Sequence, residues 1–188
     1  MSSQTCLPGG FLRTCQQRGV IPTRFVFTVK IATQTAALFE KYPYFEAVAP
    51  CSFYQLQKAY RCSTSKFGIG SVAGSNCTPL GLHRIAEKIG GGWPVGTVFR
   101  SRRRVGYTWQ ELPMAPITNR ILWLEGLEPG LNRGGKVDTH ARYVYIHGTG
   151  DEPTIGRPAS HGCIHLAAND LLPLYDFLPS GTLVWIAR

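Results

Sequence analysis

The stretch from His147 to Leu166, HGTGDEPTIGRPASHGCIHL, concentrates the residue types that carry out covalent chemistry. It holds three histidines, one cysteine and no lysine, and its glycines, prolines and serines exclude a long helix or strand. Fifteen residues separate His147 from Cys163, and a loop of that length can fold back to bring imidazole and thiol together. A free thiol has a pKa near ~8.5, so a neighbouring base is needed to produce the thiolate at neutral pH. The pair therefore predicts a cysteine nucleophile, with a histidine base, that attacks a carbonyl carbon.

Gly162 precedes the cysteine and lets the backbone approach a substrate closely. The backbone N–H groups around Gly162 and Cys163 can then point at a developing oxyanion. Such donors contribute roughly 2.7–4 kcal/mol each in enzymes where the effect was measured. We therefore expect this turn to supply an oxyanion hole.

Strands rich in β-branched and aromatic residues surround the stretch and must position it. ARYVYIH (141–147) predicts a strand that runs directly into His147. A helix is expected from about Asn169 to Leu178, capped by Asn169 or a neighbour, with Pro173 near its first turn. The other predicted strands are RFVFTVKIAT, LHRIAEKI and TLVWIA, whereas TAALFEKY and SFYQLQKAYRC fit a strand or a helix. The sequence predicts a mainly β fold, of sandwich or barrel-like form, with one or two short helices.

The chain length suits one domain with an appendage. Residues 1–22 read as an irregular N-terminal leader, and residues 23–188 as one catalytic domain. Residues 90–132 are a possible lid insertion, rich in Pro/Gly turns. Its aromatic residues either line that lid or belong to the core, and they are Trp93, Tyr107, Trp109 and Trp123.

The composition is typical of a soluble globular protein with a basic surface, since 20 Lys and Arg stand against 11 Asp and Glu. The densest basic run, Arg100–Arg104, fits a solvated turn or a contact with a polyanionic envelope. No nucleic-acid reader motif is visible, and we expect no nucleic-acid partner. No apolar run approaches the ~20 residues of a transmembrane segment, and no secretory signal is visible at the start.

The six cysteines, at positions 6, 15, 51, 62, 77 and 163, include no C-x-x-C pair. If Cys163 stays free, the other five cannot all pair, so most are expected to be reduced and partly buried. A metal site formed by Cys163 with His147, His161 and His165 is an alternative, but zinc sites use tighter paired spacings. We expect no metal and no cofactor. His83 and His140 have no partner pattern and are expected on the surface or in strands.

The combination HGT…IGRPASHGCIHL resembles the signature of the L,D-transpeptidase catalytic domain family, in which a His-Gly-Thr-like turn precedes a Ser-His-Gly-Cys box. STSKFGIGSVAGSNCTPLGLHRI is similar to the family's strand-turn segment with Thr-Pro-x-Gly, and NDLLPLYDFLPSGTLVWI to its closing helix and strand. The likeness covers residues 60–188 well and 24–60 weakly, and it does not reach 1–22.

The resemblance implies a role for each matching residue. Cys163 would form a thioester with a peptidoglycan stem peptide, and His147 would activate the thiol and later transfer protons. The carbonyl of Gly148 would orient that imidazole. Ser160, His161 and Gly162 would shape the oxyanion hole and hold the loop. Substrate-binding residues would be Thr149, Arg157 and His165, the last of which stands where the family commonly has arginine.

The family's reaction transfers the acyl group to an amine, giving a 3→3 crosslink or a similar product. Two alternatives remain at this stage. Water could resolve the same thioester, as in an L,D-carboxypeptidase or endopeptidase, or the chain could be a non-catalytic wall-binding module. The resemblance implies a location in the periplasm or cell wall, although a cytoplasmic one stays open because no export signal is visible.

Overall fold

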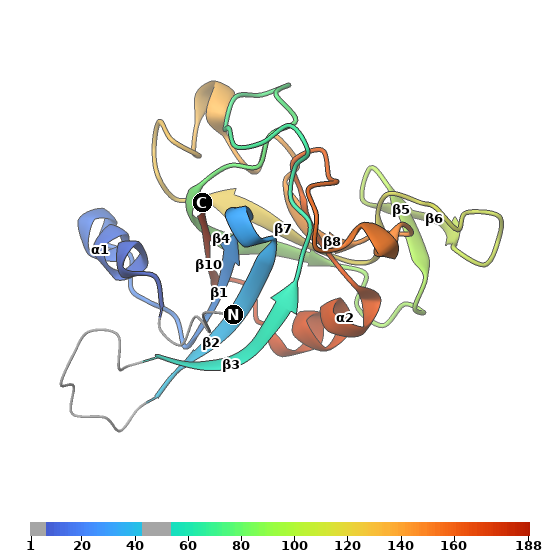
Figure 1. Cartoon of the computed structure of the whole chain (residues 1–188), viewed down its shortest axis with the longest axis horizontal. Coiled ribbons are helices and arrows are strands. Elements are labelled where there is room, and N and C mark those ends of the chain that lie inside the picture. Colours follow the sequence, from blue (N-terminus) through green and yellow to red (C-terminus); the bar gives the residue numbers. More distant parts are fainter. Residues whose placement is uncertain (1–6, 43–53) are drawn as a thin grey trace.

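The computed structural model describes residues 7–42 and 54–188 (Figure 1). Within these ranges the chain forms ten β-strands, two α-helices and three short 3-10 helices. The helical elements are α1 (Gly9–Arg18), α2 (Ala168–Phe177), η1 (Ile31–Thr33), η2 (Gly135–Val137) and η3 (Glu152–Thr154). The strands are β1 (Phe25–Lys30), β2 (Thr35–Lys41), β3 (Tyr54–Arg61), β4 (Gly81–Ile89), β5 (Thr97–Arg100), β6 (Arg103–Tyr107), β7 (Thr118–Gly126), β8 (Tyr145–Gly148), β9 (Ile164–Leu166) and β10 (Leu183–Ala187). The predicted mainly β fold with two helices is confirmed.

All the strands belong to one mixed sheet, which runs β3-β2-β1-β10-β4-β7-β5-β6, with β8 paired to β7 and β9 paired to β8. Most neighbours are antiparallel. The pairs β1–β10 and β8–β9 are parallel. The two segments that fitted either a strand or a helix are the strands β2 and β3.

Strand β1 is buried on both faces of the sheet, and its alternating side chains enter two separate cores. Val26 packs into the core beneath α1, together with Phe11 and Leu82. Phe27 packs into the opposite core beneath α2, together with Leu171. The near-continuous apolar sequence of β1 follows from this burial, because neither face meets water.

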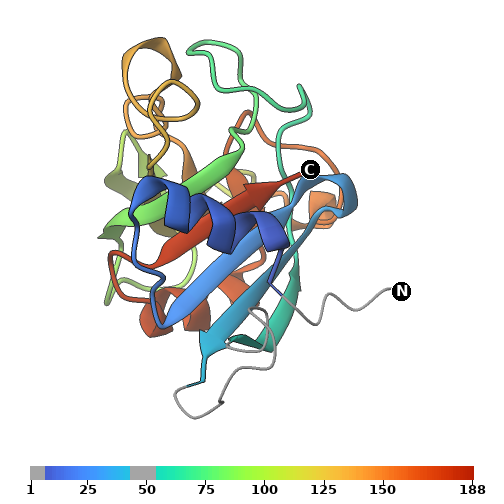
Figure 2. The ribbon, with the colours of Figure 1, turned by 90° about the vertical axis from the view of Figure 1, so that its left-hand side faces the viewer.

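Helix α1 lies across one face of the sheet (Figure 2), so the predicted irregular leader is wrong for the described part of residues 1–22. Phe11 and Cys15 are buried, and the Phe11 ring meets Tyr54 and Trp185 edge-on. Gly19 ends the helix in the left-handed conformation, with φ 63°. The apolar stripe spans only three turns and is flanked by Pro8 and Gly19, which hid it in the sequence.

Helix α2 covers the other face, close to the bounds expected from the sequence. Its N-cap is Ala167 without a side-chain cap, so the expected cap at Asn169 is wrong. The Ala168 N–H donates instead to Oε1 of Glu152 at 2.7 Å. A carboxylate from a distant segment thus occupies the position that a local Asn or Asp usually fills.

Residues 90–132 do not form one insertion, because β7 lies in the middle of the sheet. Ile121, Leu122 and Leu124 in β7 are fully buried, and Trp123 is 8% exposed. Before β7, the β5–β6 hairpin stands away from the body (Figure 1). The expected lid is therefore wrong for β7, and any lid is confined to residues 90–117. Among the described residues, no helix is both long and apolar enough to cross a bilayer.

Candidate active site

Two short parallel strands carry the residues singled out in the sequence. β8 and β9 pair Ile146 with Ile164 and His147 with His165. Side chains alternate along each strand, so His147 and His165 share a face with Tyr145 and Cys163, which lie two positions earlier. The expected strand over 141–147 begins only at Tyr145, because Arg142 and Tyr143 form turns back to Asp138 and His140.

The turn before Cys163 is closed by the side chain of Ser160. Ser160 Oγ donates to the Cys163 carbonyl at 2.6 Å and accepts from the Gly162 N–H at 3.2 Å. Ser160 is fully buried, so both bonds lie in a low-dielectric environment that strengthens them. The Gly162 N–H is thereby engaged, which corrects the expectation that it is free to receive an oxyanion.

Thr78, in the Thr-Pro segment noted in the sequence, also hydrogen-bonds to this turn. Thr78 Oγ1 donates to the Gly162 carbonyl at 3.1 Å and accepts from the Ser65 N–H at 3.0 Å. Gly162 has φ 120°, and a Cβ there would lie 3.3 Å from the Cys77 carbonyl oxygen. Glycine is needed because the conformation and the close approach both disfavour a side chain.

The open side of β9 is held by a further extended segment. Ser63 N–H donates to the His165 carbonyl at 3.0 Å, and His165 N–H donates to the Ser63 carbonyl at 2.8 Å. Although β9 has only three residues, it is hydrogen-bonded along both edges. This fixes the backbone around Cys163 despite the short strand.

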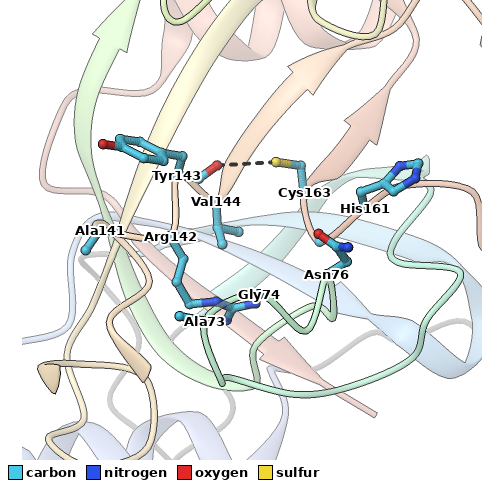
Figure 3. A pocket seen from close by; sticks show the side chains of 10 residues that line it. Ala73, Gly74, Asn76, Ala141, Arg142, Tyr143, Val144, His161 and Cys163 are labelled. Atoms are coloured by element: carbon cyan, nitrogen blue, oxygen red, sulfur yellow. Dashed lines mark hydrogen bonds between the residues drawn. The ribbon is translucent and has the colours of Figure 1, made fainter. Parts of the chain in front are cut away.

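Cys163 is half-buried and opens into a cavity of about 230 Å³ (Figure 3). The walls come from three segments that lie far apart in the sequence. The lining residues are Ala73, Gly74, Asn76, Ala141, Arg142, Tyr143, Val144, His161, Gly162 and Cys163. The sulfur points toward the Tyr143 carbonyl, its acceptor at 3.5 Å, and receives the Tyr145 N–H at 3.4 Å.

The His147 imidazole is buried behind this cavity, 2% exposed, and its Nδ1 lies 2.8 Å from the Gly148 carbonyl. If that carbonyl accepts a hydrogen bond from Nδ1–H, Nε2 keeps its lone pair and can act as a base. The ring lies 4.7 Å, centroid to centroid, from that of His165 and 6.2 Å from that of Tyr145.

No hydrogen bond joins Cys163 Sγ to the His147 ring in this part of the chain, since the described partners of the sulfur are Tyr145 and Tyr143. The two side chains occupy diagonal positions on one sheet face, a separation that ring side chains can span. Catalytic hydrogen bonds are often long before substrate binds. Proton transfer therefore requires the two side chains to move closer together than they are in this structure.

Burial sets the protonation state of this pair. It raises the pKa of the Cys163 thiol to about 11, opposed by the Tyr145 N–H and by the Arg142 charge, which both lower it. It also lowers the pKa of His147 to about 4, while the Gly148 hydrogen bond opposes this shift. Both groups are therefore neutral near pH 7, as thiol and imidazole.

His165 also remains neutral. Burial lowers its pKa to about 3, and repulsion from His147 and His161 adds to the effect. Its Nδ1 is buried without a hydrogen-bond partner. The position where the family commonly has arginine therefore carries no fixed charge in this chain.

The remaining predicted residues are dispersed. His161 lines the cavity, with its ring 5.5 Å from that of Phe67. Thr149 is buried away from the cavity, and its Oγ1 accepts from the Asp151 N–H at 3.1 Å. Arg157 is exposed on the loop between η3 and β9 and does not line the cavity. The fold thus brings His161 to the cysteine, but neither Thr149 nor Arg157.

Sequence reasoning missed the three other lining residues with polar side chains: Asn76, Arg142 and Tyr143. Arg142 and Tyr143 were assigned to a regular strand, whose alternation gave no reason to select them. Asn76 lies in the segment similar to the family's Thr-Pro region, and its place beside that motif was the available signal.

The four described cysteines, Cys15, Cys62, Cys77 and Cys163, are free thiols, as expected; Cys6 and Cys51 lie outside the described residues. The part of the chain that the structure describes holds no group of three or more metal-ligating side chains. His83, expected on the surface or in a strand, lies in β4 and is fully buried. His140 stacks on Trp123, with ring centroids 4.0 Å apart.

A family model identifies the class of domain to which this fold and cysteine site belong. The YkuD family model, described as L,D-transpeptidase catalytic domain, matches residues 53–186. The chain belongs to this family, which confirms the resemblance noted in the sequence. No curated protein matches the chain.

Solved structures share the fold at low sequence identity. Bdellovibrio bacteriovorus Bd1075 superposes with a TM-score of 0.55 at 15% identity, covering 97% of this chain and 53% of that one. L,D-transpeptidase 3 from Mycobacterium tuberculosis, solved with a faropenem-derived adduct, gives 0.51 at 16% identity, covering 88% of this chain and 60% of that one. An L,D-transpeptidase from Mycobacterium smegmatis gives 0.50 at 15% identity, covering 88% and 59%. The chain thus spans between half and three fifths of the length of these relatives.

Proposed function

We propose that the chain is a cysteine-dependent L,D-transpeptidase that acts on peptidoglycan stem peptides. The observation that supports this best is a half-buried thiol that opens into a cavity and shares one sheet face with an imidazole oriented by Gly148. The two alternatives are a hydrolase, in which water resolves the acyl-enzyme, and a wall-binding module without catalytic activity. Family membership agrees with the proposal.

In the proposed reaction, Cys163 Sγ attacks the carbonyl carbon of the donor peptide bond while its proton passes to Nε2 of His147. Both groups are neutral at rest, so proton transfer accompanies the attack instead of preceding it. The imidazolium then gives the proton to the departing amine of the D-residue, and a thioester remains on Cys163. The Cys163 N–H is the nearest candidate oxyanion donor, because Ser160 holds that of Gly162.

In the second half-reaction an acceptor amine attacks the thioester and loses a proton to His147. The C–S bond breaks, the thiol is restored, and a new amide joins two stem peptides. A substrate of this kind places the enzyme in the periplasm or cell wall.

The test incubates the full chain with disaccharide-tetrapeptides and identifies the products by mass spectrometry. We expect crosslinked dimers from the wild type. Cys163→Ser should form dimers at least about 10³-fold more slowly. The matched control is Cys15→Ala, a buried cysteine of α1, which should keep dimer formation unchanged in the folded protein.

Two other outcomes decide against the proposal in different ways. Tripeptide without dimer means that water resolves the thioester, which makes the chain a carboxypeptidase. No product together with no faropenem-derived mass on Cys163 means that the site is silent, as in a wall-binding module.

A further inference from the structure

Arg142 is the charged residue of the cavity that the proposed mechanism does not use. Among the described residues that line the cavity it is the one lysine or arginine, and no carboxylate lines it. Two residues separate it from the start of β8, and it stands opposite Cys163 across the cavity (Figure 3).

The guanidinium is tied to the loop that forms the facing wall. Arg142 Nη2 donates to the Cys77 carbonyl at 2.8 Å and approaches Ser75 Oγ at 3.5 Å, while Nη1 donates to the Gly70 carbonyl at 3.3 Å. These partners span residues 70–77, the segment that also presents Asn76 to the cavity. Arg142 therefore joins the turn before β8 to this loop.

Each of those partners is neutral, so the guanidinium charge has no counter-ion among them. Burial lowers the pKa of Arg142, while the Cys77 and Cys163 thiols act in the opposite direction. Arginine stays protonated under such shifts. A fixed positive charge with no neutralising carboxylate therefore acts on the neighbouring sulfur, in a half-buried site where screening is weak.

We propose that Arg142 is a positioning residue of the active site: it anchors the 70–77 loop and supplies the fixed positive charge that favours the Cys163 thiolate. The inference rests on the proposed function in taking Cys163 as the nucleophile. It assigns to Arg142 the constant charge that the neutral imidazoles of His147 and His165 lack.

Other titratable side chains also surround the sulfur. They are Tyr143 and Tyr145 on the β8 side, His147 behind the cavity, His161 and His165 flanking the cysteine, and Cys77 on the loop. His147 and His165 are neutral above about pH 5 because burial lowers the pKa of both. Their protonation does not contribute to a pH profile measured between pH 6 and pH 10.5.

The test follows alkylation of Cys163 by iodoacetamide from pH 6 to pH 10.5, read on the Cys163 peptide by mass spectrometry. The proteins are wild type, Arg142→Met and Arg142→Lys, each shown to be folded by circular dichroism. We expect the Arg142→Met profile to shift to higher pH, with alkylation at pH 8 about tenfold slower, which corresponds to one pKa unit. Arg142→Lys should recover most of the lost rate, because lysine restores the positive charge. The recovery should be incomplete, because lysine lacks the planar set of donors.

Arg133→Met is the matched control, since Arg133 is a half-exposed arginine near Glu125 and away from the cavity. Its profile should follow the wild type. An unshifted Arg142→Met profile overturns the inference. So does an Arg142→Lys protein as slow as Arg142→Met, because loss of loop packing alone would then explain both.

The readout does not depend on peptidoglycan chemistry. A shifted profile with no muropeptide product supports the inference while the proposed function fails. A Cys163 that stays unlabelled at every pH in all the proteins overturns the inference, whatever the muropeptide assay gives.

Discussion

The sheet core and the reactive site of this protein are built in opposite ways. The core rests on long strands such as β4 and β7, nine residues each, whose apolar side chains are covered on both faces. The site is built on β8 and β9, which have four and three residues. Hydrogen bonds from Ser160, Thr78 and Ser63 hold this region. A loss of apolar packing in the core should therefore leave the geometry of the site unchanged. The site depends instead on a few hydrogen bonds.

The largest expected effect is a loss of stability when the core beneath α1 is disrupted and the site is left intact. Phe11 is fully buried between the helix and the sheet, so Phe11→Ala should lower the free energy of unfolding by about 3–5 kcal/mol. Urea denaturation measures this loss. The alkylation rate of Cys163 in the protein that remains folded should stay within about twofold of the wild type, because the site does not rest on this core.

Phe67→Ala is the matched control, since Phe67 is 52% exposed. Its stability should stay within about 0.5 kcal/mol of the wild type. If Phe11→Ala slowed alkylation by an order of magnitude, the two regions would be coupled and the distinction between them would fail.

A smaller effect should come from acid, through His83 in the core. Burial lowers its pKa from 6.5 to about 4, so above pH 6.5 the ring is neutral in both the folded and unfolded states. Between pH 6.5 and pH 4 the unfolded chain binds a proton that the folded chain does not, so stability falls as the pH falls. At pH 5 the loss from this residue alone is about 2 kcal/mol.

The measurement compares urea unfolding at pH 8 and pH 5 for the wild type and for His83→Gln, in which that titration is removed. The decrease in stability between the two pH values should be smaller in the variant by about 2 kcal/mol. Equal decreases in both proteins would show that His83 accepts its proton in the folded state.

The smallest effect is expected at the contact between the two regions. Glu152, in the loop between His147 and Cys163, accepts the Ala168 N–H that begins α2. Glu152→Ala should cost about 1 kcal/mol of stability, the usual loss for an N-cap acceptor, while Glu152→Gln keeps an oxygen acceptor and should lose less. Thermal unfolding compares them, and an equal loss in both would assign the effect to the carboxylate charge.

The sequence predicted elements where the pattern is local. The β-branched and aromatic residues of β1 and the apolar face of α2 were visible because each depends on neighbouring residues. The cap of α2 was missed because Glu152 lies 16 residues away, and α1 was missed because its apolar stripe is short. Long-range contacts of this kind leave no local signal.

The same limit applies to the site. Cys163 and His147 were selected by residue type and by a family motif that lies within twenty residues. Arg142 was not, because its role appears only when residues 70–77 fold against it. Arg157 was chosen as a nearby cation in the same loop, but proximity in sequence did not bring it to the cavity.

The parallel pairing of β8 with β9 sets a lower limit on the length of the segment between them. Neighbouring parallel strands need a crossing connection of about a dozen residues or more, because the chain must return to the end from which it started. Fifteen residues separate the base from the nucleophile here, so little could be deleted before that return became impossible. A variant with a much shorter segment would have to reverse one strand, and Cys163 would then lie at the opposite end of the strand pair from its present position. The spacing between the two reactive residues is therefore required by the topology as much as by the chemistry.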